Sequence, residues 1–204
     1  MIVPSMTLTE IRRELYKDVP ILKRKIIYVT DDMKKHLTKQ STATLYERFF
    51  DYNSKYKNQW IYRIGFLNMK TNNSMILMFH NGKGHAGIIV TSELQLVYHT
   101  AHFFQRFNER CNLGFTDYKD VVHAYLHDNS RLQFTTLDQI EPGVFTIFSV
   151  INKGIILGTF NSGIDLVKAN TFLPNHMLNK NQNELKNELA EKLNKYKDHS
   201  QLLN

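Results

Sequence analysis

The chain has 204 residues, the size of one domain with room for a helical appendage. Hydrophobic residues make up 42% of it and include 13 Phe and 10 Tyr, which argues against a chain that is disordered throughout. The formal net charge of +7 favours a polyanionic partner such as nucleic acid or an acidic protein, and the single cysteine excludes an internal disulfide.

The sequence shows no sign of a membrane or secretory segment. No apolar run approaches the roughly 18 residues of a transmembrane helix, and residues 1–20 are too charged for a signal peptide. We therefore expect a soluble, cytoplasmic protein with no membrane partner. Cys111 ends an apolar helical stretch, where a buried structural thiol is expected in preference to a nucleophile.

The N-terminal residues, 1–58, are predicted to form a helical segment. A capping-box pattern over Thr7–Glu10 begins a helix that Pro20 interrupts. A second helix is expected over 30–39 and a third over 44–53. These helices could form a packing layer or an arm that binds a partner.

From residue 59 the pattern becomes that of β-strands. Short segments rich in aromatic and β-branched residues are separated by turn signals at Asn72-Asn73 and at the glycine turn of residues 81–84. The strands are expected at 60–69, 74–80, 86–91 and 94–99, and then at 132–136, 144–152, 154–160 and 164–170.

Three helices complete the expected set. The first, Ala101–Arg110, follows a strand directly, and the second, 117–127, is capped by Thr116. A polar helix over 181–197 carries a narrow stripe typical of a docking edge, formed by Leu185, Leu189 and Leu193.

Together these elements predict an α+β fold. Its core, residues 59–174, is an antiparallel, curved sheet with the helix pair 101–127 packed on it. The helical segment 1–58 precedes this core, and a C-terminal helical tail, 175–204, follows it.

Nine histidines raise the question of a metal site. His123 and His127 have the i, i+4 spacing of two metal ligands on a helix, but Ala124 stands where a metalloprotease motif needs glutamate. His80 and His85 flank a glycine turn that leads into a strand, so this turn indicates a hairpin and not a phosphate-binding loop. We therefore expect no metal and no other cofactor.

The helix Ala101–Arg110 concentrates groups that can carry chemistry. At about 100° per residue its polar side chains lie within one arc of roughly 100°, beside a separate aromatic face. The polar set is His102, Arg106, Glu109 and Arg110. Histidine exchanges protons near neutral pH, arginine holds phosphate in a fork, and glutamate acts as a base or fixes an arginine.

These are the parts that a metal-independent ribonuclease needs. One group takes the proton of the 2′-hydroxyl, cations stabilise the pentacovalent phosphate, and another group protonates the leaving oxygen. His99, at the junction of strand and helix, is a second candidate proton carrier. The alternative is that the whole polar face is simply solvated.

The same helix also resembles a known family. The spacing His-x3-Arg-x2-Glu-Arg, followed by a capped second helix and strands, is similar to the helix pair of the RelE/BrnT-like ribonuclease-toxin superfamily. The resemblance covers residues 99–160, and the preceding strands and the terminal helices depart from the family pattern. It implies a role at the RNA phosphate for four residues, His102, Arg106, Glu109 and Arg110.

The function expected from the sequence is RNA cleavage or RNA binding in the manner of such toxins. One alternative is a non-enzymatic phage or mobile-element protein, a virion component or assembly factor whose terminal helices contact a protein partner. A third is a nucleic-acid-binding regulator whose binding depends on salt and leaves no cleavage products.

Overall fold

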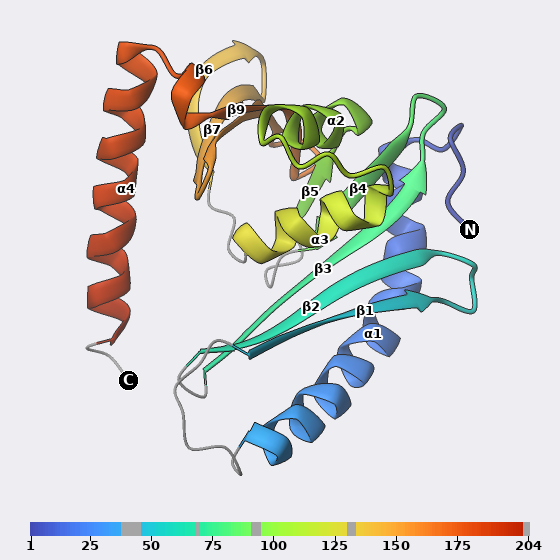
Figure 1. Cartoon of the computed structure of the whole chain (residues 1–204). Coiled ribbons are helices and arrows are strands. Elements are labelled where there is room, and N and C mark those ends of the chain that lie inside the picture. Colours follow the sequence, from blue (N-terminus) through green and yellow to red (C-terminus); the bar gives the residue numbers. More distant parts are fainter. Residues whose placement is uncertain (38–45, 68–69, 91–94, 130–133, 202–204) are drawn as a thin grey trace.

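The computed structural model describes residues 1–37, 46–67, 70–90, 95–129 and 134–201 and has the predicted α+β fold (Figure 1). The helices are α1 (Leu8–Leu37), α2 (Ala101–Arg110), α3 (Tyr118–Asp128), the short 3₁₀ helix η1 (Asn175–Met177) and α4 (Lys180–Gln201). The strands are β1 (Tyr46–Asn53), β2 (Gln59–Leu67), β3 (Lys70–His80), β4 (His85–Val90), β5 (Leu96–His99), β6 (Thr135–Glu141), β7 (Val144–Ile151), β8 (Gly154–Asn161) and β9 (Leu166–Pro174).

The nine strands form one sheet in the order β1-β2-β3-β4-β5-β9-β8-β7-β6. Each of the two runs, β1–β5 and β6–β9, is an antiparallel meander. The runs join through the parallel pair of β5 and β9, which begins with Leu96 opposite Leu166. The helix pair α2 and α3 lies in the chain between these two runs, as the sequence predicts.

The two faces of the sheet are covered by different helices. Ile88 and Ile89 are neighbours in β4, and their side chains point to opposite faces of the sheet. Ile88 packs with residues of α1, and Ile89 packs with residues of α2 and α3. In β7, Phe148 packs with Leu189 of α4, whereas Ile147 faces the α2–α3 side. Helices α1 and α4 therefore cover the face opposite α2 and α3.

The sheet curves around the helix pair. Ile61 of β2 and Ile147 of β7 belong to the same buried cluster as α2 and α3, although six strand spacings, about 29 Å in a flat sheet, separate their strands. A register shift between Leu157 and Gly158 helps the sheet to bend. A Cβ at Gly158 would lie 1.9 Å from the Lys168 carbonyl oxygen, so this close approach requires glycine.

Helix α1 is continuous from Leu8 to Leu37, which corrects the predictions that Pro20 interrupts it and that a separate helix begins at residue 30. Pro20 lies on the exposed side of the helix, where the loss of its N–H removes one backbone hydrogen bond. On the inner side, Leu15, Val19 and Leu22 are buried against the sheet. This tertiary packing outweighs the local cost of the proline.

A buried polar network fixes α1 to β2. Asp18 is fully buried, and its Oδ2 accepts hydrogen bonds from Asn58 Nδ2 at 2.8 Å and Trp60 Nε1 at 3.0 Å. Asn58 in turn accepts a bond from the Ile2 backbone N–H at 2.9 Å. Asp18 thus satisfies two buried donors at once.

Replacing Asp18 by alanine is expected to lower the free energy of unfolding by about 3 kcal/mol, because both buried donors lose their acceptor. Asp18→Asn should cost less, because its one amide oxygen can still accept both bonds, although without the charge of the carboxylate. Urea unfolding followed by tryptophan fluorescence measures both values, since Trp60 is the reporter. Equal stability of wild type and Asp18→Ala would contradict this role.

Three further local predictions are wrong. Residues 46–53 form strand β1 and not a helix, and Asn72-Asn73 lies within β3 and not in a turn. The cap of α3 is Asp117, which accepts from the Lys119 backbone N–H at 2.9 Å, in place of Thr116. The first positions of the predicted strand 132–136 lie outside the described residues.

The C-terminal helix docks as its leucine stripe predicts. Leu189 is buried, and Leu185 packs beside it against Phe148 and Ile155 of the sheet. The side chain of Leu193 lies outside the described residues. Among the described helices, none combines the length and the apolar composition needed to cross a membrane.

Candidate functional site

Helix α2 is capped by Thr100, whose hydroxyl accepts a hydrogen bond from the Phe103 backbone N–H at 3.1 Å. Its aromatic side chains Phe103 and Phe107 are fully buried between the sheet and α3. This burial fixes the rotation of the helix, because the opposite arc must then face away from the core. The polar residues predicted from the sequence lie largely on that outer arc.

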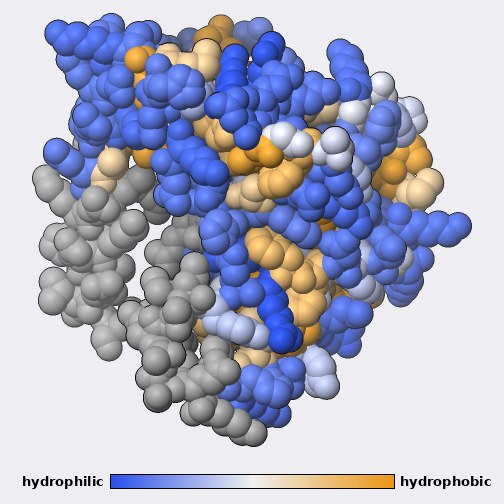
Figure 2. Space-filling model, viewed as in Figure 1, coloured by the Kyte–Doolittle hydropathy of each residue, from blue (hydrophilic) through white to orange (hydrophobic). Residues whose placement is uncertain are grey.

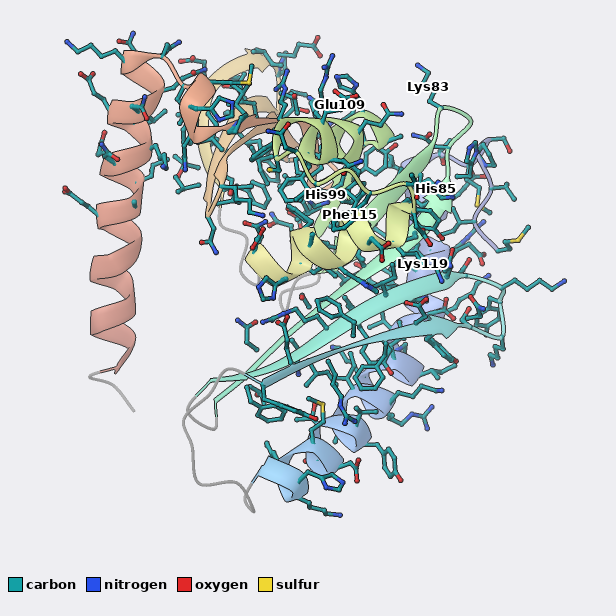
Figure 3. The ribbon with its side chains drawn as sticks, in the orientation of Figure 1. Lys83, His85, His99, Glu109, Phe115 and Lys119 are labelled. Atoms are coloured by element: carbon teal, nitrogen blue, oxygen red, sulfur yellow. The ribbon has the colours of Figure 1, made fainter. Side chains whose placement is uncertain are left out.

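Three of these residues form a hydrogen-bonded row on the surface. His102 Nε2 accepts a bond from Arg106 Nε at 3.2 Å, and Arg106 Nη1 donates to Glu109 Oε2 at 3.1 Å. The side chains of Arg106 and Glu109 are 40% and 61% exposed. Glu109 lies on the outward side of α2 in Figure 3. Figure 2 shows that this side of the molecule is mostly hydrophilic, with hydrophobic patches between the polar side chains. We call His102, Arg106 and Glu109 the α2 row.

Arg110 has a different environment. Its guanidinium donates from Nη1 to the backbone carbonyl oxygen of Phe172 in β9, and the side chain is half-buried. This bond ties the last turn of α2 to the sheet. Arg110 therefore positions the helix that carries the α2 row.

His99 is not part of the exposed row. It is fully buried, its Nε2 lies 2.8 Å from the Tyr125 hydroxyl, and its ring contacts Phe103 edge to face. Figure 3 shows it on the inner side of α2, toward α3. Burial lowers the pKa of the imidazole to about 3, against a smaller opposing effect of the Val97 backbone. His99 is therefore a neutral core residue at neutral pH.

The β3–β4 hairpin lies against the first turn of α2. A Cβ at Gly84 would be 3.2 Å from the Ala101 Cβ and 3.8 Å from Gln105 Nε2. Gly84 also has a φ of +141°, which only glycine adopts readily. The neighbouring Lys83 is exposed at the tip of this hairpin (Figure 3), so it adds a cation near the N-terminal end of the row.

The paired histidines of α3 contact carboxylates of β1. His127 Nδ1 is hydrogen-bonded to Glu47, and His123 lies 3.8 Å from Asp51, which also pairs with Lys119. Within the described part of the chain, no group of three or more His, Cys, Asp or Glu side chains is arranged to hold a metal ion. The sequence did not reveal these pairs, because residues 46–53 were predicted to be helical.

The other two candidate histidines form an aromatic contact at the hairpin. His80 and His85 meet edge to face at 5.5 Å, and His85 stacks on Tyr118 with ring centroids 3.6 Å apart. Burial and the neighbouring His80 lower the pKa of His85. The Tyr118 hydroxyl donates to Gln59 at 2.7 Å, so this stack joins α3 to the sheet.

Cys111 packs at the edge of the core, half-buried, and burial raises the pKa of its thiol. A raised pKa disfavours the nucleophilic thiolate. The raised pKa fits the structural thiol predicted from the sequence, although Cys111 is half-buried and not buried as predicted.

The structure thus brings together three of the five candidate residues, His102, Arg106 and Glu109. Arg110 follows them on the same helix but bonds to the sheet, and His99 lies in the core. No protein-family model, curated protein or solved structure matches this chain.

Proposed function

We propose that this protein cleaves RNA without a metal ion, with the α2 row as its active site. The observation that carries the proposal is the exposed series of hydrogen bonds from His102 through Arg106 to Glu109. This series supports the proposal because an imidazole, a guanidinium and a carboxylate, the groups that such a reaction needs, follow one another along one helix. The net charge of +7 and the resemblance of residues 99–160 to ribonuclease toxins also support RNA as the substrate.

In the proposed reaction Glu109 acts as the base and takes the proton of a ribose 2′-hydroxyl. The 2′-oxygen attacks the adjacent phosphorus, and the bond from phosphorus to the 5′-oxygen breaks. His102, in its protonated form, donates a proton to that leaving oxygen. The products are a 2′,3′-cyclic phosphate and a free 5′-hydroxyl, and the transferred protons balance.

Arg106 stabilises the charge on the phosphate in this scheme. A guanidinium has five N–H donors, and the bonds to His102 and Glu109 use two of them. When RNA binds, the guanidinium turns toward the phosphate and frees His102 Nε2 to carry a proton. Arg110 holds the helix in place, and His99 takes no part because its ring is buried and neutral.

Expression in bacteria tests this function in the cell. Wild-type protein is expected to slow growth and to degrade cellular RNA, whereas Arg106→Ala at the same level should do neither. Arg106→Lys, which keeps the charge but not the fork, should retain part of the effect. Normal growth with intact RNA on wild-type expression would count against the proposal.

A second candidate function is that of a non-enzymatic assembly protein, and the exposed edge strand β6 is the observation that supports it. This strand is at an edge of the sheet, and its Leu137 and Ile140 are 40% and 53% exposed. Edge strands with apolar side chains can pair with another chain. This function predicts concentration-dependent oligomers, reduced by Ile140→Lys, in light-scattering measurements. A monodisperse monomer at high concentration would contradict it.

A further inference from the structure

The outer side of α1 carries a concentration of positive charge. Five exposed cations occur within residues 13–25, namely Arg13, Lys17, Lys23, Arg24 and Lys25. The neighbouring Arg12 is half-buried and donates to the Asp165 carbonyl oxygen at 2.9 Å. The same stretch has two carboxylates, and one of them, Asp18, points inward to bond with Asn58 and Trp60. Glu14 pairs with Lys17, and the other exposed cations leave an excess of positive charge on the solvent side.

The cations follow the helix axis. At about 100° per residue, Arg13, Lys17 and Arg24 lie within roughly 40° of one another, and Tyr28 lies beside them. At about 1.5 Å per residue, the distance along the axis from Arg13 to Tyr28 is about 22 Å. A row of this length can contact several successive phosphates of one nucleic-acid strand.

Aromatic rings lie among these cations. The ring of Tyr56, in the β1–β2 turn, has Lys17 Nζ 5.7 Å and Lys55 Nζ 4.9 Å from its centroid. Lys25 Nζ lies 4.1 Å from the ring of Tyr52. On α1 itself, Tyr28 is 76% exposed. Tyr52 and Tyr56 are half-buried, so Tyr28 is the most accessible of the three rings. Cations interleaved with aromatic rings are typical of surfaces that bind single strands, because phosphates pair with the cations while bases stack.

We propose that this basic–aromatic surface, made of Arg13, Lys17, Arg24, Tyr28, Lys55 and Tyr56, binds single-stranded RNA. The inference rests on the proposed function for the identity of the polyanion. The surface lies on the α1 face of the sheet, opposite the α2 row (Figure 1). It holds a part of the RNA that is distant from the phosphate being cleaved. A flexible single strand can pass around an edge of the sheet to contact both faces, which a stiff duplex cannot do.

Binding of a single-stranded 20-nucleotide RNA with 2′-O-methyl groups tests the surface, because this probe lacks the attacking hydroxyl. Fluorescence anisotropy across a range of KCl concentrations gives the affinity and its salt dependence. The test variant is Arg13→Gln/Arg24→Gln, and the control Lys180→Gln/Lys186→Gln removes the same charge from α4. Tyr28→Ala tests stacking without a change of charge.

The Arg13/Arg24 variant is expected to bind on the order of tenfold more weakly, and its salt slope should fall by about 1.4, or about 0.7 per lost contact. Tyr28→Ala should also weaken binding roughly tenfold, with an unchanged slope. The α4 control should bind like wild type. A duplex of the same sequence should bind more weakly than the single strand.

Other results separate this inference from the proposed function. Equal binding by the Arg13/Arg24 variant and the α4 control, or no binding by wild type, overturns the RNA site on α1. If the Arg13/Arg24 variant and the α4 control bind equally, loss of cleavage in His102→Ala would still support the α2 row as the active site. Binding that depends on Arg13 and Arg24 without any cleavage of unmodified RNA would keep the α1 site and overturn the proposed catalysis.

Discussion

Replacing His102 by alanine is expected to lower the rate of RNA cleavage by at least a hundredfold while the fold is retained. General acid catalysis by a positioned side chain contributes about 10²- to 10⁴-fold to a rate. His102 is exposed and bonds only to Arg106 among the contacts described, so its removal should cost little stability. Initial rates on a defined single-stranded RNA at saturating concentration measure the effect.

The matched control is His176→Ala, which removes another exposed histidine, in η1. This variant should cleave RNA at the wild-type rate. Arg110→Ala should instead lower the thermal midpoint, because its bond to the Phe172 carbonyl anchors α2. If His102→Ala and His176→Ala cleave equally fast, His102 is not the proton donor.

Acidification is expected to destabilise the protein through His99. In the unfolded chain this imidazole takes up a proton near pH 6.5, whereas in the folded protein burial lowers its pKa to about 3. Between these values the unfolded state binds more protons, so stability is full above about pH 6.5 and falls as the pH decreases. The slope from this one residue is about 1.4 kcal/mol per pH unit, which amounts to about 2 kcal/mol at pH 5.

Urea unfolding at pH 7 and pH 5 measures this loss, and His99→Gln, which takes up no proton, should show a smaller difference. Should His99→Gln not fold at pH 7, an NMR titration of the wild-type ring gives the same information. The His99 resonances should remain those of a neutral imidazole down to pH 4. Protonation of His99 near pH 6 in the folded protein would contradict its burial against Tyr125.

Periodicity correctly predicted the elements that bury one face and expose the other. In α2, Phe103 and Phe107 alternate with polar residues at helical spacing, and the observed helix has the predicted bounds. Strand β1 was mistaken for a helix because a few apolar positions, including Phe49, fit both periods. The segment forms a strand because it pairs with β2, and this pairing cannot be recognised from the sequence of the segment alone. Burial of α1 similarly overrides the local effect of Pro20.

The candidate site could be predicted in part for the same reason. The i, i+3 and i+4 spacings bring the α2 row together within one helix, without help from distant segments. The position of His99 depends on Tyr125, 26 residues away, and that of Arg110 on a carbonyl oxygen of β9. The cations of α1 lie close together in the sequence, but the rings of Tyr52 and Tyr56 come beside them only after folding.

The most direct measurement of the central claim is the chemistry of the RNA ends. Purified wild-type protein is incubated with a 5′-labelled single-stranded RNA in excess EDTA, alongside the same RNA with one 2′-deoxynucleotide at the cut position. We expect fragments that end in a 2′,3′-cyclic phosphate and a 5′-hydroxyl, and no cut at the deoxy position. Intact RNA, or 5′-phosphate ends that form only when a divalent metal is restored, would contradict the role of the α2 row.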